Sequence, residues 1–109
     1  MEDDNSKNDT FKQIIDLKDD ALHTPVRLAT LMFLLPRSKT PFPEIQKALG
    51  LTSGNLASHI KKLEEIELIY VEKLFVDNKP TTLVEISPGG ISAINNYATT
   101  LRNALENVK

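Results

Sequence analysis

The sequence contains no cysteine. The chain can therefore form no disulfide bond, no thiolate metal site and no cysteine nucleophile, which fits a protein of the reducing cytoplasm. Long hydrophobic runs are also absent, because the longest, Leu28 to Leu35, is interrupted by Thr30 and is far shorter than the roughly 20 residues that a bilayer requires. The segment Met1 to Asn5 has neither the basic nor the apolar region of a signal peptide. We expect a cytoplasmic protein with no membrane segment.

The residues that are present fit a small globular domain. Of the 109 residues, 40% are hydrophobic and 26% are charged, a balance typical of soluble folded domains. A chain of this length buries roughly 60 to 70% of its unfolded surface, so a modest core can form without disulfide bonds. Residues 1–9 are polar and acidic without apolar periodicity, and we expect them to form a flexible tail. Residues 10–109 are expected to form a single domain.

The charge is unevenly distributed along the sequence. The net charge is −2, but residues 24–63 carry six bases and one acid, whereas residues 1–23 and 64–109 are both net negative. A basic block of this kind is typical of a nucleic-acid-binding surface. It is also common on solvated faces of other proteins, so its meaning depends on the architecture of the segment that carries it.

Two helices are predicted in the first third of the chain. Apolar residues recur at helical spacing over Thr10–Leu22, which predicts an amphipathic helix. A second helix is expected from Pro25 to Leu35, because Thr24 is a favourable N-cap and proline is favourable at the first helical position. This segment is apolar nearly all round, so we expect it to be the central helix of the core.

A tight turn joins the next two predicted helices. Residues 36–41 indicate a loop, and a short third helix begins near Pro43 and ends at Gly50, since glycine tolerates the left-handed conformation after a helix. Thr52 or Ser53 can cap a fourth helix, which is expected to run from about Ser53 to Glu65. At about 100° per residue, its apolar side chains share one face: Leu56, Ile60 and Leu63. The opposite face carries small, polar and cationic residues, joined near the end by one acid: Gly54, Asn55, Ser58, Lys61, Lys62 and Glu65.

The hydrophobic period changes after Glu67. β-Branched and aromatic residues over 68–76 and 81–86, separated by Asp77-Asn78-Lys79-Pro80, predict a β-hairpin. Ser87-Pro88 then starts a last helix that extends to Val108. Its apolar residues alternate steps of three and four, which is typical of a coiled-coil-like seam: Ile91, Ile94, Ala98, Leu101, Leu105 and Val108.

This order of elements resembles a known family of regulators. Residues 24–96, from Thr24-Pro25-Val26-Arg27-Leu28-Ala29 to Ser87-Pro88-Gly89-Gly90, are similar to the small winged-helix transcriptional regulators of the MarR/ArsR-like type. The most specific part is Gly50-Leu51-Thr52-Ser53-Gly54-Asn55-Leu56-Ala57-Ser58-His59-Ile60-Lys61-Lys62-Leu63-Glu64. The resemblance implies an α+β, mainly helical fold, a winged helix-turn-helix of residues 24–86 with a two-stranded wing and flanking helices 10–22 and 88–108. It also implies a DNA-binding repressor or activator, usually a homodimer, with the helix containing Asn55 and Ser58 in the major groove of double-stranded DNA.

The fourth helix has the side chains that base recognition requires. Ser53, Asn55 and Ser58 are short and polar, and Asn55 can form a bidentate pair with an adenine edge. Gly54 removes bulk where the helix backbone approaches the duplex. Lys61 and Lys62 are expected to contact phosphates.

Further candidates lie at the edges of this surface. His59 falls between the core face and the outward face, so it is either a packing residue or a DNA contact. Lys73 and Lys79 in the wing are candidates for contact with the DNA backbone. Relatives often carry arginine at the wing tip, where this chain has Asp77-Asn78-Lys79-Pro80, so we do not expect the wing to insert into the minor groove. Four more bases surround the motif without a fixed helical phase: Arg27, Arg37, Lys39 and Lys47.

Other functions have less support in the sequence. It has no phosphate-binding glycine loop, metal-ligand cluster or nucleophile with an evident base, so we expect neither an enzyme nor a bound cofactor or metal. A winged-helix protein-interaction module and an architectural DNA-binding protein with little sequence preference stay open as alternatives. We expect homodimerisation through the helices Thr10–Leu22 and Pro88–Val108, since two-fold symmetry matches palindromic DNA sites.

Overall fold

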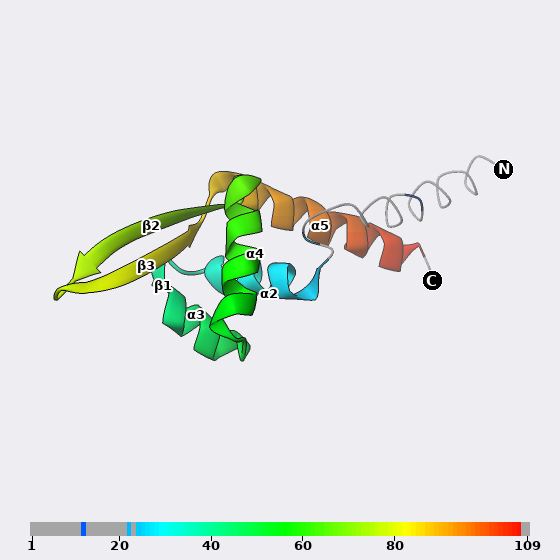
Figure 1. The fold of residues 1–109 in the computed structure, drawn as a ribbon. Helices are drawn as coiled ribbons and strands as arrows, with labels where there is room; N and C mark the ends of the chain where they lie inside the picture. Colours follow the sequence, from blue (N-terminus) through cyan, green and yellow to red (C-terminus); the bar gives the residue numbers. More distant parts are fainter. Residues whose placement is uncertain (1–11, 13–21, 23, 108–109) are drawn as a thin grey trace.

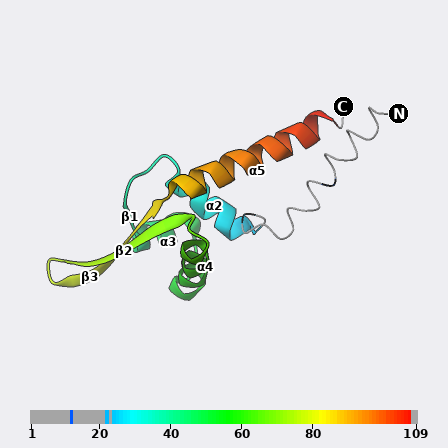
Figure 2. The same ribbon diagram turned by 90° about the horizontal axis from the view of Figure 1, so that it is seen from above.

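The computed structural model describes residues 12, 22 and 24–107. In chain order, residues 24–107 form these elements: α2 (Pro25–Leu34), β1 (Thr40–Pro41), α3 (Phe42–Leu49), α4 (Ser53–Glu65), β2 (Ile69–Val76), β3 (Lys79–Ile86) and α5 (Pro88–Glu106). Helices α2, α3 and α4 form a compact body, from which the β2–β3 hairpin projects on one side and α5 on the other (Figures 1 and 2). The predicted helix Thr10–Leu22 and the acidic tail lie outside the described residues, apart from helical Lys12 and fully buried Leu22.

The core lies where the helices meet the base of the sheet. Its fully buried side chains come from every helix of the body and from two strands: Leu31, Leu34, Ile45, Leu56, Leu63, Ile69 and Val84. Helix α2 contacts α3, α4, α5 and β3, so it is the central helix, as predicted. Two apolar side chains near its end are nevertheless exposed, Met32 by 57% and Leu35 by 40%.

The starts of the helices follow the sequence signals, with one exception. Thr52 caps α4, and its Oγ1 accepts a hydrogen bond from the Asn55 backbone N at 3.1 Å. Ser87 caps α5 in the same way, accepting from the Gly90 backbone N at 3.0 Å. Thr24 occupies the N-cap position of α2, but its side chain makes no capping hydrogen bond. The start of α2 therefore depends on Pro25 rather than on the predicted threonine cap.

The strands form one antiparallel sheet in the order β1-β3-β2. Strands β2 and β3 make the predicted hairpin, but its turn is only Asp77 and Asn78, which both adopt the left-handed conformation with φ of 52° and 65°. Lys79 and Pro80, which the sequence assigned to the turn, belong to β3. A two-residue turn of this kind matches the natural twist of a hairpin. Strand β1 was not predicted, and it adds a short third strand by pairing Thr40 with Val84.

Helix α5 begins where β3 ends and runs away from the wing (Figure 2). Ser87 fixes this junction, because its hydroxyl also donates a hydrogen bond to the Glu67 carbonyl at 2.7 Å. Gly90 lies so close to Leu68 that an added Cβ would collide with the Leu68 carbonyl oxygen. Helix α5 contacts α2 and β3. None of the described helices is long and apolar enough to cross a membrane.

Candidate nucleic-acid interface

A tight turn sets α4 against α3. Gly50 ends α3 in the left-handed conformation, with φ of 65°. The backbone N of Leu51 donates to the carbonyl of Gln46 at 3.2 Å, which satisfies one of the last carbonyls of α3. Thr52 then caps α4 at once. The predicted helix–turn–helix geometry is confirmed, with Thr52 as the capping residue.

Helix α4 has the two faces that its sequence predicts. Leu56 and Leu63 are fully buried, and Ile60 is 6% exposed. The residues assigned to the outward face are all exposed: Gly54, Asn55, Ser58, Lys61, Lys62 and the acid Glu65. Ser53, in the first turn, is exposed as well. The apolar face therefore holds the helix on the body, while short polar groups and two cations point outward. Their contact with DNA stays a prediction.

His59 has a partner within the protein. Its ring is half-buried, and Nδ1 accepts a hydrogen bond from Nε of Arg27 at 3.2 Å. The Nε–H of Arg27 can only donate, so Nδ1 is the accepting nitrogen of this ring. This contact joins α2 to α4 and supports the packing interpretation of His59. Sequence reasoning missed Arg27 as its partner, because the two residues lie 32 positions apart and no pattern links them.

Two of the predicted lysines meet at one groove. Lys61 of α4 and Lys73 of β2 line a groove of about 520 Å³ between the recognition helix and the wing. The groove has an apolar floor that includes Ala57, Ile60 and Val71. Lys62 and Lys79 are exposed but lie outside this groove. The structure thus brings a cation from α4 and a cation from the wing to the same hollow, which the carboxylate of Glu64 also lines.

Three bases of the central block have structural partners. The Arg37 guanidinium lies 3.7 Å from the centre of the Phe33 ring and donates to the Phe33 carbonyl. Lys39 forms an ion pair with Glu72 of β2 at 2.8 Å, and this carboxylate raises the pKa of Lys39 above its ordinary value. Arg27 binds His59. Part of the block therefore has a structural role, whereas Lys47, Lys61 and Lys62 are exposed and have no ion pair among the described residues.

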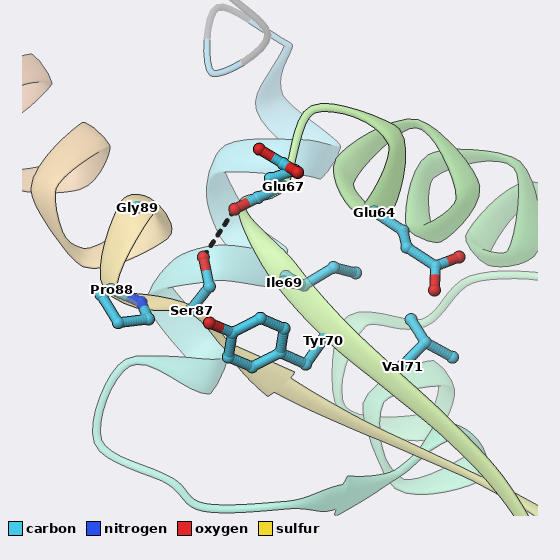
Figure 3. Close-up of a pocket in the computed structure, with 8 residues that line it drawn as sticks. All are labelled: Glu64, Glu67, Ile69, Tyr70, Val71, Ser87, Pro88 and Gly89. Carbon is cyan, nitrogen blue, oxygen red and sulfur yellow. Dashed lines mark hydrogen bonds between the residues drawn. The ribbon is translucent and has the colours of Figure 1, made fainter.

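The C-terminal end of α4 borders an acidic pocket. Figure 3 shows this hollow of about 540 Å³ at the base of the wing, with Glu64 and Glu67 on its wall beside Tyr70, Ser87 and other residues. Ser87 donates to the Glu67 carbonyl across it (Figure 3). Two carboxylates disfavour the approach of a phosphate. The surface suited to an anion therefore does not include this pocket, and its cations are Lys61 and Lys62 on α4 and Lys73 on the wing.

A helix–turn–helix with an exposed polar second helix, flanked by a projecting hairpin, defines a winged helix DNA-binding domain. A family model with that description matches residues 26–105. The chain belongs to this family of winged helix DNA-binding domains.

Relatives of known structure have the same architecture. The solved structure of a transcriptional regulator homologue from Pyrococcus horikoshii is 40% identical with a TM-score of 0.83, and the match covers 93% of this chain and 98% of that one. Two more distant structures share the fold. A MarR-family structure from Enterococcus faecalis is 18% identical with a TM-score of 0.69, and the match covers 84% of this chain and 82% of that one. The MepR–DNA complex of S. aureus is 19% identical with a TM-score of 0.66, and the match covers 84% of this chain and 78% of that one. An uncharacterized protein of Methanocaldococcus jannaschii is 30% identical over 84 residues, which are 77% of this chain and 91% of that protein.

Proposed function

We propose that the protein regulates transcription by binding a specific sequence of double-stranded DNA, with α4 in the major groove. The observation that carries this proposal is the division of α4. Leu56, Ile60 and Leu63 anchor one face in the core, while the other face is exposed and combines short polar side chains with lysines. A helix of this kind fits the major groove, where amide and hydroxyl groups can distinguish all four base pairs. Ser53, Asn55 and Ser58 are the proposed base-reading residues, and Gly54 allows close approach.

The exposed lysines are proposed to contact the phosphates of the DNA backbone. Lys61 and Lys73 lie on the two sides of the groove between α4 and the wing, so a DNA backbone that passes α4 would meet both. Lys62 and Lys79 extend this positive surface along α4 and along the wing. His59, held by Arg27, serves mainly to position α4, and a contact from its Nε2 to DNA is a secondary part of the proposal. These roles supply affinity and register, whereas the polar residues supply sequence preference.

The proposed active form is a homodimer in the cytoplasm, in which residues 10–109 form one domain. On α5, Ile91, Ala98 and Leu105 recur every seven residues and are exposed, Ile91 by 40% and Leu105 by 68%. A row of this spacing forms one stripe along a helix and is suited to a matching helix. The helix predicted over Thr10–Leu22 is assigned to the same interface. Two copies would then present two α4 helices to the half-sites of a palindrome.

Selection from a random duplex library tests the proposal. Protein is incubated with the library, bound duplexes are sequenced, and the affinity for the enriched sequence is compared with that for a scrambled duplex at the same salt concentration. A specific regulator enriches one motif, with two half-sites about one helical turn apart, and binds it at least 10³-fold more tightly than scrambled DNA. Equal affinity for both duplexes would favour an architectural DNA-binding protein. Absence of binding to any duplex would favour a protein-interaction module.

A further inference from the structure

The hydrogen bond between Arg27 and His59 fixes a ring at the border of the exposed face of α4. Nδ1 of His59 accepts from Nε of Arg27 at 3.2 Å, and both side chains are half-buried. Arg27 lies in the first turn of α2. A side chain of the core helix therefore holds a side chain of the proposed recognition helix, although the two lie 32 positions apart in the sequence.

His59 lies on the flank of α4 that faces away from the wing. At about 100° per residue, it falls between buried Leu56 and exposed Asn55 around the helix axis. The opposite flank borders the wing, because Ala57 and Lys61 line the groove shared with β2. A helix that lies in a major groove has a sugar–phosphate backbone on each side. With Lys61 turned toward one of these backbones, His59 is turned toward the other.

The bond from Arg27 determines which group the ring can offer to a ligand. A neutral imidazole has one donor and one acceptor nitrogen, so a neutral ring whose Nδ1 accepts from arginine has its donor at Nε2. Without the arginine, nothing on Nδ1 favours this arrangement over the one with the proton on Nδ1. Phosphate oxygens of DNA accept hydrogen bonds from side chains. The Nε2–H of His59 is therefore the group that a phosphate beside this flank can bind.

We propose that Arg27 is a positioning residue for DNA recognition, which directs the Nε2–H of His59 to a phosphate on the side of α4 away from the wing. This inference rests on the proposed function, because it requires that α4 lies in the major groove. Arg27 acts here through His59 and makes no contact of its own with DNA. Because Arg27 belongs to α2, the direction of the ring depends on the packing of α2 against α4.

A double-mutant cycle on the duplex that the unaltered protein selects tests this coupling. Arg27→Met keeps an unbranched side chain and removes the donor, and His59→Leu removes both ring nitrogens. We expect Arg27→Met to weaken DNA binding about three- to tenfold, which corresponds to the loss of one hydrogen bond. In the His59→Leu background, Arg27→Met should change the affinity less than twofold. An equal loss in both backgrounds would overturn the inference and leave the proposed function intact, because Arg27 would then act on DNA directly.

Arg37→Met is the matched control for charge. It removes one positive charge from the same basic block, but this arginine packs on the ring of Phe33 and not on α4. We expect it to change the DNA affinity less than twofold. An equal loss for Arg27→Met and Arg37→Met would overturn the inference, because the loss would then follow from net charge alone.

Glutamine at position 59 distinguishes hydrogen bonding from packing. Its carbonyl oxygen can accept from Arg27, and its amide N–H can donate to a phosphate. His59→Gln should therefore bind the selected duplex more tightly than His59→Leu, and this advantage should disappear when Arg27→Met is added. Equal affinities for His59→Gln and His59→Leu would indicate that the ring only fills space and would overturn the inference.

Nitrogen NMR of the histidine rings locates the donor directly. The chain has two histidines, so the signals that disappear in His59→Leu belong to His59. At about pH 8, where histidine is ordinarily neutral, we expect a proton on Nε2 and none on Nδ1, and slower exchange of the Nε2 proton with water once the selected duplex is bound. Arg27→Met should shift the signals toward a mixture of both tautomers. A proton on Nδ1 in the unaltered protein, or exchange of the Nε2 proton that DNA does not slow, would overturn the inference. Failure of the unaltered protein to bind any duplex would overturn the proposed function as well.

Discussion

At the first turn of α5, Gly90 leaves no space for a side chain, whereas Gly54 in the first turn of α4 has no atom within 4 Å of an added Cβ. Gly90→Ala should therefore destabilise the fold by about 3 kcal/mol, because the Leu68 carbonyl and the Ile86 side chain must move. Gly54→Ala should leave stability unchanged or raise it by up to about 1 kcal/mol, since alanine is the better helix former. Chemical denaturation of the two variants measures both values. Equal destabilisation would contradict the packing at the α5 junction.

Gly54→Ala should also change the affinity for DNA. If the α4 backbone approaches the duplex at this position, the added methyl group should weaken DNA binding while the fold stays intact. Fluorescence anisotropy with the selected duplex measures this separation of stability from affinity. Unaltered affinity would remove Gly54 from the interface.

Lys62 and Lys39 carry the same charge and have different surroundings. Lys62 is exposed, with no ion pair among the described residues, and Lys39 is paired with Glu72. Lys62→Ala should reduce the slope of log affinity against log salt by about 0.9, the change expected for one lost phosphate contact. Lys39→Ala should leave the slope unchanged. The measurement is a series of binding titrations at increasing salt, and equal slopes for the two variants would contradict the assignment of Lys62.

At the scale of elements, the N-caps of α2 and α4 provide a matched pair. Thr52 caps α4 through its side chain, whereas Thr24 stands at the N-cap of α2 without a capping hydrogen bond. Thr52→Ala should lower the free energy of unfolding by about 1 kcal/mol. Thr24→Ala should lower it by less, and thermal melting of the two variants makes the comparison. A larger loss for Thr24→Ala would contradict the assigned capping geometry.

The sequence predicted an element correctly where the residues that determine it lie close together in the chain. Helix α4 was predicted with its observed bounds, Ser53–Glu65, because the glycine stop, the capping threonine and the apolar period lie within one short segment. Strand β1 was not predicted, since two residues in a loop carry no period and pair only through contact with β3. The shorter hairpin turn was also missed. Pro80 is a typical turn residue, yet it occupies β3 at the tip of the wing.

The site shows the same division between local and distant signals. The exposed face of α4 follows from helical phase alone. The partners of Arg27, Arg37 and Lys39 could not be predicted from the sequence. Two of these contacts join segments more than 30 residues apart, and a count of charges does not distinguish a paired base from a free one. The groove shared by Lys61 and Lys73 likewise depends on how the hairpin folds beside α4.

At the scale of the whole molecule, the exposed stripe of α5 predicts self-association. Leu105→Glu places a charge in the proposed seam, and Asn103→Glu adds the same charge at a nearby exposed position outside the heptad row. Light scattering should report a monomer for Leu105→Glu and a dimer for Asn103→Glu at micromolar concentration. DNA affinity should fall for the first variant only, because two linked half-sites bind more tightly than one. If the unaltered protein is itself a monomer at this concentration, the proposed dimer is wrong.

The central claim is that the outward face of α4 reads bases, and the sequence preference of Asn55→Ala tests it most directly. Asn55 is exposed, so the substitution leaves the core intact. Binding of the unaltered protein and the variant is measured on duplexes that carry every single base change in the selected motif. We expect Asn55→Ala to lose about 1 to 3 kcal/mol of binding free energy on the preferred motif and to stop discriminating at one base pair in each half-site. An equal loss on every duplex, with the full pattern of preferences retained, would contradict the claim.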